Sequence, residues 1–345
     1  MAFARQSHTA TLLPNGSVLL TGGMNATGAL ATAELFHPAS NTFTLAGNMR
    51  AARVGHTATL LPDGRVLITG GSNASGALAT AEFFHPTSGT FTSAGTMRSA
   101  RVGHTATLLN SGKVLVAGGG TATAELFDPR TGQFTAVGEM SASRSYHTAT
   151  RLISGEVLIA GGTALDAGGT ALGELFNPTT EKFTPTANPG TAALFVAAAM
   201  LANGNVLLTG GELAGRSCGF CGAPLISSTN VAFLFNNGTA KFSETGSVSN
   251  SLASHTATLL TSGQVLVAGG RFINSFCDRG CPRVLTKATT VAELYNPATG
   301  NFSATGNLKT ARSSHTATLL GNGKVLVAGG VDVNGNALAS AELYQ

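Results

Sequence analysis

Short runs in which apolar and small polar residues alternate recur along the chain, and each is followed by a turn and a wholly apolar run. In the clearest copy, the run 56–61 ends at a Pro-Asp-Gly turn, and the apolar run 66–69 ends at Gly70 and Gly71. Short runs rich in Thr, Val, Ile and Leu between turn residues predict strands, and a tight Asp-Gly turn predicts a hairpin. No window shows the period of an amphipathic helix. The pattern therefore predicts antiparallel β-structure throughout.

The hairpin belongs to a unit that occurs seven times. Six Gly-Gly pairs follow a histidine by 14 residues, whereas the pair at Gly210 has Val196 in that place. Successive pairs are 48, 48, 43, 49, 59 and 60 residues apart. A third run with Glu-Leu-Phe and a fourth around a phenylalanine complete each full unit, and four antiparallel strands per unit predict a closed β-propeller. The histidines are His8, His56, His104, His147, His255 and His315.

These features resemble the kelch family. The resemblance rests on the Gly-Gly doublet, on the Arg-x-x-His motif that begins a unit (Arg53 to His56), and on the third strand from Glu125 to Pro129. It covers essentially all 345 residues and extends to bacterial kelch proteins and to the central domain of galactose oxidase. With the seven units, it implies an all-β, seven-bladed kelch-type β-propeller with four antiparallel strands per blade. The sequence stops at a third strand (341–345), so we expect the seventh blade to lack its fourth strand in this chain. Phe stands where the family often has Trp.

We expect a single domain over residues 1–345. Either the seventh blade has only three strands, or the sequence is an excerpt of a longer chain. The excerpt is favoured, because an open outer edge invites unwanted pairing. The approximate repeats are 1–48, 49–96, 97–139, 140–188, 189–247, 248–307 and 308–345.

Arginine and glutamate recur with the histidine, which favours a structural role over a metal or catalytic one. Five units place Arg three residues before the His, and six carry Glu on the third strand. Unit five loses all three together, with Ala193, Val196 and Phe233 in their places. This joint loss indicates that the three side chains interact through hydrogen bonds and ion pairs between strands or blades.

The composition argues against several classes of binding partner and location. Only 10% of the residues are charged and the net charge of +4 is spread thinly, so we expect no nucleic-acid partner. No apolar run reaches 18 residues, which argues against membrane insertion. The N-terminus lacks the apolar stretch of a signal peptide. We nevertheless expect an extracellular or cell-surface protein whose leader is not present in this chain.

Units five and six carry long insertions between their second and third strands. The step from the second glycine to the residue before the Glu position is 10 residues in unit one and 5 in unit three, but 21 and 22 in units five and six. Neighbouring blades place both insertions side by side on one face, where long loops usually carry function. The ligand-binding residues predicted there are Arg216, Phe220, Arg271, Asp278, Arg279 and Arg283.

All four cysteines lie in these insertions. Disulfides are the favoured interpretation, either Cys218–Cys221 with Cys277–Cys281 or a bond between the loops. A four-cysteine zinc site is the alternative, because the C-x-x-C and C-x-x-x-C spacings suit it. Free or redox-active thiols are a third possibility.

Two functions compete. The first is a non-enzymatic binding or scaffold propeller that needs no cofactor and recognises a protein or a glycan through the loop face. The alternative is a copper-radical oxidase similar to galactose oxidase, in whose family the chemistry needs Tyr and His ligands and a Tyr cross-linked to Cys. The chain offers Tyr146, Tyr295 and Tyr344, and Tyr146 precedes His147, but no cysteine lies in that repeat. We therefore favour the binding propeller.

Overall fold

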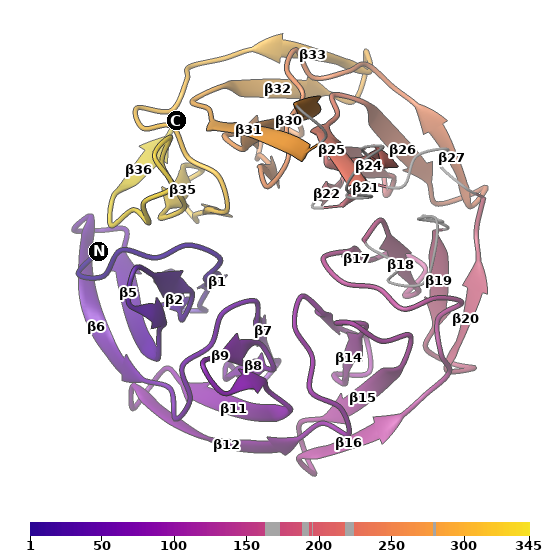
Figure 1. The fold of residues 1–345 in the computed structure, drawn as a ribbon. Coiled ribbons are helices and arrows are strands. Elements are labelled where there is room, and N and C mark those ends of the chain that lie inside the picture. Colours follow the sequence, from indigo (N-terminus) through magenta and orange to yellow (C-terminus); the bar gives the residue numbers. More distant parts are fainter. Residues whose placement is uncertain (163–172, 188–192, 195, 218–223, 279–280) are drawn as a thin grey trace.

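The computed structural model describes residues 1–162, 173–187, 193–194, 196–217, 224–278 and 281–345. Within these ranges the chain forms strands and no helix, and the strands build a ring of seven blades around a central axis (Figure 1). The predicted seven-bladed kelch-type propeller is thereby confirmed. No described helix has the length and apolar character needed to cross a bilayer.

Each blade is an antiparallel sheet whose first strand lies at the hub and whose fourth lies at the rim (Figure 1). The first strands are β1 (Thr9–Leu12), β7 (Thr57–Leu60), β13 (Thr105–Leu108), β17 (Thr148–Arg151), β22 (Ala197–Met200), β28 (Thr256–Leu259) and β34 (Thr316–Leu319). The second strands are β2 (Val18–Thr21), β8 (Val66–Thr69), β14 (Val114–Ala117), β18 (Val157–Ala160), β23 (Val206–Thr209), β29 (Val265–Ala268) and β35 (Val325–Ala328).

The outer half of each blade follows the same order. The third strands are β5 (Thr32–His37), β11 (Thr80–His85), β15 (Ala124–Asp128), β19 (Glu174–Asn177), β26 (Ala232–Asn236), β32 (Ala292–Asn296) and β36 (Ala341–Tyr344). The fourth strands are β6 (Thr42–Asn48), β12 (Thr90–Thr96), β16 (Gln133–Ala136), β20 (Lys182–Pro185), β27 (Lys241–Glu244) and β33 (Asn301–Ala304). Blade seven has three strands among the described residues, as predicted. Two small hairpins, β3 (Met24–Asn25) with β4 (Gly28–Ala29) and β9 (Ser72–Asn73) with β10 (Gly76–Ala77), extend blades one and two.

The apolar core lies between neighbouring blades. Every second strand is buried along its whole length, because both of its faces are covered by adjacent sheets. On the outer half, a third-strand aromatic packs on the fourth-strand phenylalanine, as Phe127 does on Phe134 at 4.6 Å between ring centroids. Such a pair adds about 0.5–1.5 kcal/mol to the burial of each ring. Phenylalanine thus fills the place where the kelch family often has tryptophan.

The two insertions join in one five-stranded sheet on a single face of the ring. Its order is β21 (Ala193–Leu194), β24 (Glu212–Ser217), β25 (Pro224–Ser228), β30 (Arg271–Asp278) and β31 (Cys281–Ala288). Ser227 of the first insertion pairs with Asn274 of the second. The prediction that the two insertions lie side by side is therefore confirmed.

Candidate functional site at the hub

The repeated arginine and glutamate form buried ion pairs within the blades. In blade two, Nη2 of Arg53 lies 2.7 Å from Oε1 of Glu82, and Nη1 donates to the carbonyl oxygens of Gly70 and Thr80. The carboxylate also accepts the backbone N–H of Arg50, on the segment that arrives from blade one. Equivalent pairs are Arg5–Glu34, Arg101–Glu125, Arg144–Glu174 and Arg312–Glu342. The structural role predicted for these two residues is confirmed.

The histidines have other partners than predicted. Nε2 of His56 lies 3.1 Å from Oγ1 of Thr9 and 3.2 Å from Oγ1 of Thr21, both in the preceding blade. The predicted structural role of the histidine, hydrogen bonding between adjacent blades, is therefore confirmed, whereas the expectation that its side chain joins Arg and Glu in one group is wrong.

The histidine rings are neutral at physiological pH. Burial, assisted by the positive charge of the arginine three residues earlier, lowers the pKa of His56, His104 and His147 to about 3. His255 lacks that arginine, and burial lowers its pKa to about 4. These rings form a polar but uncharged wall.

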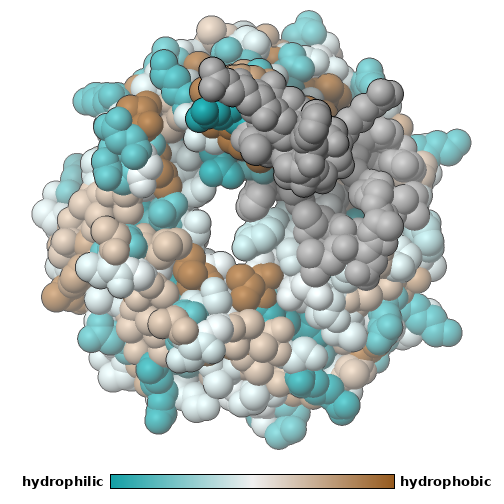
Figure 2. All heavy atoms as spheres, in the orientation of Figure 1, coloured by the Kyte–Doolittle hydropathy of each residue, from teal (hydrophilic) through white to brown (hydrophobic). Residues whose placement is uncertain are grey.

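A hollow of about 340 Å³ opens at the hub, on the face that carries the insertions (Figure 2). It is lined by the six histidines, by Val196, and by the residue before each histidine. That preceding residue has a positive φ in every described case, a conformation that costs little only for glycine. The residues are Ser7, Gly55, Gly103, Tyr146, Ser254 and Ser314, with φ between 50° and 65°.

Tyr146 breaks the symmetry of this lining. It is the one large side chain among these six described residues, it is 43% exposed, and its φ is 55°. Its N–H donates to the carbonyl of Gly103 at 2.7 Å, and a Cβ added to Gly103 would stand 2.8 Å from Cε1 of Tyr146. The positive φ is shared with the serines and glycines at the equivalent positions, so the size and exposure of its side chain set Tyr146 apart. The sequence signal for it is the Tyr that precedes His147, where the equivalent residues of the other described blades are serine or glycine.

An ion pair links the two insertions beside the hub. Nη2 of Arg271 lies 2.7 Å from Oε1 of Glu212, which is buried. The backbone of Arg271 forms an antiparallel β-bridge with that of Ala253, which precedes Ser254 of the hub lining. The equivalent positions in the described blades one, two, three and seven are Met24, Ser72, Gly120 and Val331, so this pair belongs to one sector alone.

The structure describes only some of the other residues that were predicted to act in the insertions. Arg283 is exposed on β31. The backbones of Arg216, Asp278, Cys277 and Cys281 lie in strands, with Cys277 opposite Pro282 and Asp278 opposite Cys281, but their side chains fall outside the described part. Phe220, Arg279, Cys218 and Cys221 lie outside the described residues altogether. The disulfide and zinc hypotheses therefore stay predictions.

Comparison with known proteins places the fold. No family model and no curated protein matches this sequence. Among solved structures, the chain is similar to a fungal alcohol oxidase of the AA5 family in complex with copper, with a TM-score of 0.76, 19% identity, and coverage of 97% of this chain and 73% of that one. It is also similar to YjhT, with a TM-score of 0.59, 14% identity, and coverage of 99% and 95%. The chain is a kelch-type β-propeller.

The comparison corrects our functional prediction. The first of these kelch propellers is an enzyme, which contradicts the non-enzymatic binding or scaffold reading and favours the oxidase-like alternative. The non-enzymatic hypothesis rested on the low charge and on the absence of any singular constellation of catalytic residues from the repeats. The hub carries a singular group, Tyr146, that a scaffold does not require. At 19% identity the likeness itself establishes the fold alone.

Proposed function

We propose that this propeller is an enzyme that acts on a small alcohol bound in the hub hollow, with Tyr146 as the residue that contacts the substrate hydroxyl. The observation that carries the proposal is the large, partly exposed phenol at a position that the other described blades fill with serine or glycine. The alcohol class comes from the fungal alcohol oxidase to which the fold is similar.

The chemistry of the hollow suits such a substrate. Its volume of about 340 Å³ falls in the range of small-molecule sites. A phenol both donates and accepts hydrogen bonds, so Tyr146 can bind an alcohol hydroxyl in either sense. Tyrosine is also among the side chains that transfer protons in catalysis. Because the surrounding histidines are neutral, the wall favours an uncharged ligand over an ion.

Among the described residues, the donors for the copper-radical chemistry of the oxidase alternative are not assembled. Nε2 of His147 already binds Oγ1 of Thr105 at 2.9 Å. The hydroxyls of Tyr295 and Tyr344 bind threonines between the outer strands, away from the hub lining. All four cysteines belong to the insertions, and the described residues contain no group of three His, Cys, Asp or Glu able to hold a metal. The proposal therefore assigns Tyr146 binding and proton transfer at the substrate oxygen, with no step through copper.

We also propose an extracellular or cell-surface location for the protein. Its support is that cysteines confined to two loops of a charge-poor propeller are typical of exported proteins. Oxidised cysteines in the protein isolated from its source would support it, and four free thiols would contradict it.

The test is substrate binding at the hub. Saturation-transfer NMR would use glycerol, benzyl alcohol and galactose as probes, with the wild type, Tyr146→Phe and Tyr146→Ser. Serine already stands at this place in three other blades, so the second variant keeps the fold. We expect at least one probe to bind the wild type, to bind Tyr146→Phe more weakly, and to be lost from Tyr146→Ser. Binding by no probe, or equal binding by all three proteins, would reject the hub as the site.

Adding copper to the assay distinguishes the copper-radical oxidase alternative from our proposal. The assay would measure hydrogen peroxide from the same alcohols with and without copper(II). We expect copper to make no difference. Copper-dependent peroxide production would establish the oxidase and overturn our assignment of the donor set.

A further inference from the structure

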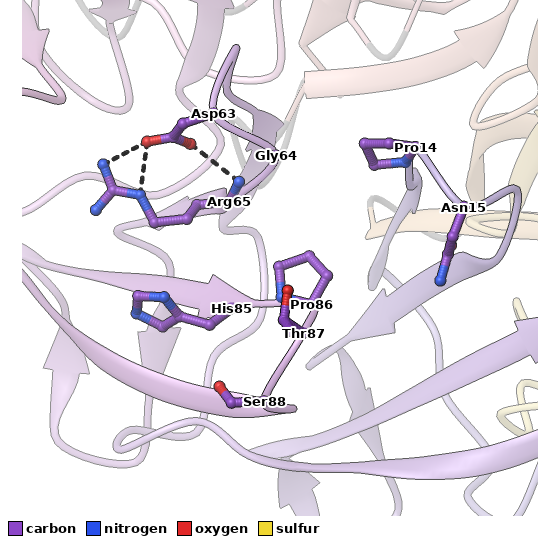
Figure 3. Close-up of a pocket in the computed structure, with 9 residues that line it drawn as sticks. All are labelled: Pro14, Asn15, Asp63, Gly64, Arg65, His85, Pro86, Thr87 and Ser88. Carbon is purple, nitrogen blue, oxygen red and sulfur yellow. Dashed lines mark hydrogen bonds and ion pairs between the residues drawn. The ribbon is translucent and has the colours of Figure 1, made fainter.

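A second hollow lies on the face opposite the insertions, where the turns between first and second strands meet those between third and fourth strands. Its volume is about 610 Å³. Pro14 and Asn15 come from the first turn of blade one, Asp63 to Arg65 from that of blade two, and His85 to Ser88 from the outer turn of blade two (Figure 3). We call this hollow the blade-two groove.

The polar groups of the groove are held in place before any ligand arrives. Oδ2 of Asp63 lies 2.8 Å from Nε of Arg65, and Oδ1 accepts the backbone N–H of Arg65 at 3.0 Å (Figure 3). The Arg65 guanidinium lies over the ring of Phe83 at 3.9 Å and donates to the carbonyl of Pro129. A guanidinium fixed by so many contacts loses little rotamer freedom when it binds a ligand.

His85 is likewise oriented, and its second nitrogen distinguishes this groove from its neighbour. Nε2 of His85 lies 2.7 Å from Oγ1 of Thr92. In blade one, Nδ1 of the equivalent His37 lies 3.4 Å from Oγ of Ser17. Blade two has Arg65 where blade one has Ser17, and no described residue takes the place of that hydroxyl beside Nδ1 of His85. The groove therefore presents a ring nitrogen together with a fixed carboxylate and guanidinium.

We propose that the blade-two groove binds a neutral saccharide. Each sugar hydroxyl both donates and accepts a hydrogen bond, and the groove offers an acceptor in Asp63, a donor in Arg65 and an imidazole in His85. The Asp63–Arg65 pair carries no net charge, which argues against phosphate or carboxylate ligands. Pro14 and Pro86 supply apolar surfaces for the C–H faces of a sugar ring.

Two smaller grooves occupy equivalent places on the same face. One lies between blades two and three, with about 270 Å³, and the other between blades seven and one, with about 400 Å³. The turns that correspond there to Asp63–Arg65 are Ser111 to Lys113 and Asn15 to Ser17, so neither repeats the Asp-Gly-Arg sequence of blade two. The groove between blades two and three also holds a carboxylate–guanidinium pair, Asp128 with Arg130, but of these three grooves the blade-two groove alone combines such a pair with an imidazole.

The test exchanges one turn for another that the protein already contains. The variant Asp63→Asn with Arg65→Ser converts Pro-Asp-Gly-Arg at 62–65 into Pro-Asn-Gly-Ser, the sequence at 14–17 in blade one. Its control, Asp128→Asn with Arg130→Ser, makes the same charge change in the neighbouring groove, where the arginine is exposed and the aspartate largely covered. The probes are glucose, galactose and N-acetylglucosamine, with inorganic phosphate as the anion, measured by calorimetry and by saturation-transfer NMR.

We expect at least one sugar to bind the wild type and the control alike, and to bind the turn variant about tenfold more weakly, the loss expected for one or two hydrogen bonds. Phosphate should not bind. Tyr146→Ser should leave sugar binding in the groove unchanged. The failure of this proposal can therefore be told apart from the failure of the proposed hub site. Binding by none of the sugars, preference for phosphate, or equal weakening in the turn variant and its control would overturn the proposal.

Discussion

His56 of blade two and Gly22 of blade one occupy complementary space, because a Cβ added to Gly22 would stand 2.7 Å from Cε1 of His56. The same contact joins each of the other five histidines to the first glycine of the preceding blade, and Gly329 with His8 closes the ring. The Gly-Gly pair and the histidine therefore form a contact between units, although they lie together within each unit of the sequence.

Gly70→Ala tests this contact. The added methyl would meet the carbonyl oxygen of Arg101 at 2.6 Å and Cε1 of His104 at 2.7 Å, at a φ of 59°. We expect a loss of about 3 kcal/mol in the free energy of unfolding, from backbone strain and overpacking together. Gly64→Ala is the control, because its φ is 86° but nothing lies within 4 Å of the added atom. Urea unfolding that gave equal losses for both variants would contradict the contact.

Glu125→Ala tests the ion pairs. Oε1 of Glu125 lies 3.0 Å from Nη2 of Arg101, and its other oxygen accepts the N–H of Arg98 at 3.0 Å. Removing the carboxylate leaves a buried guanidinium without its counter-charge, so we expect a loss of about 3–5 kcal/mol. Glu125→Gln keeps an acceptor and should lose less. Thermal unfolding measures both, and an unchanged Tm in Glu125→Ala would rule out the structural role.

The buried histidines predict loss of stability in mild acid. Their folded-state pKa is lowered by burial, to about 3 for His104, whereas the unfolded chain takes up protons near pH 6.5. The stabilisation is therefore present above about pH 6.5 and declines as the pH falls toward 3, by about 1.4 kcal/mol per pH unit for each histidine. Urea unfolding at about pH 7 and about pH 5 measures the slope. His104→Asn should reduce it, and a slope that stayed the same would contradict the assignment.

The fold was predictable because the unit repeats, whereas part of the hub was not. Arg53 and Glu82 lie in one unit and disappear together in unit five, so their pairing left a trace in the sequence. The partners of His56 lie in the preceding unit, and threonines are too frequent in every unit to mark Thr9 and Thr21 as partners.

Two further features depend on how the blades and turns meet in space. The positive φ of Tyr146 follows from its place in the hub, where its N–H meets the carbonyl of the neighbouring blade. The blade-two groove combines turns that lie far apart in the chain. The glycines before His56 and His104 mark the position as one that favours a positive φ, but no pattern within one unit marks the groove.

Gly103→Ala tests whether the orientation of Tyr146 matters for the hub. Its added Cβ would stand 2.8 Å from the ring of Tyr146, so the ring must move. Gly55→Ala is the matched control, with the same φ of 65° but with Val102 as the neighbour at 3.1 Å. We expect both variants to lose about 1 kcal/mol of stability from the backbone strain, while Gly103→Ala alone shifts the aromatic NMR signals of Tyr146 and weakens alcohol binding. Adding Tyr146→Ser to each variant completes a double-mutant cycle, in which serine relieves the clash in Gly103→Ala and changes nothing in Gly55→Ala. Equal effects on Tyr146 and on binding in both glycine variants would show that the phenol does not depend on this contact.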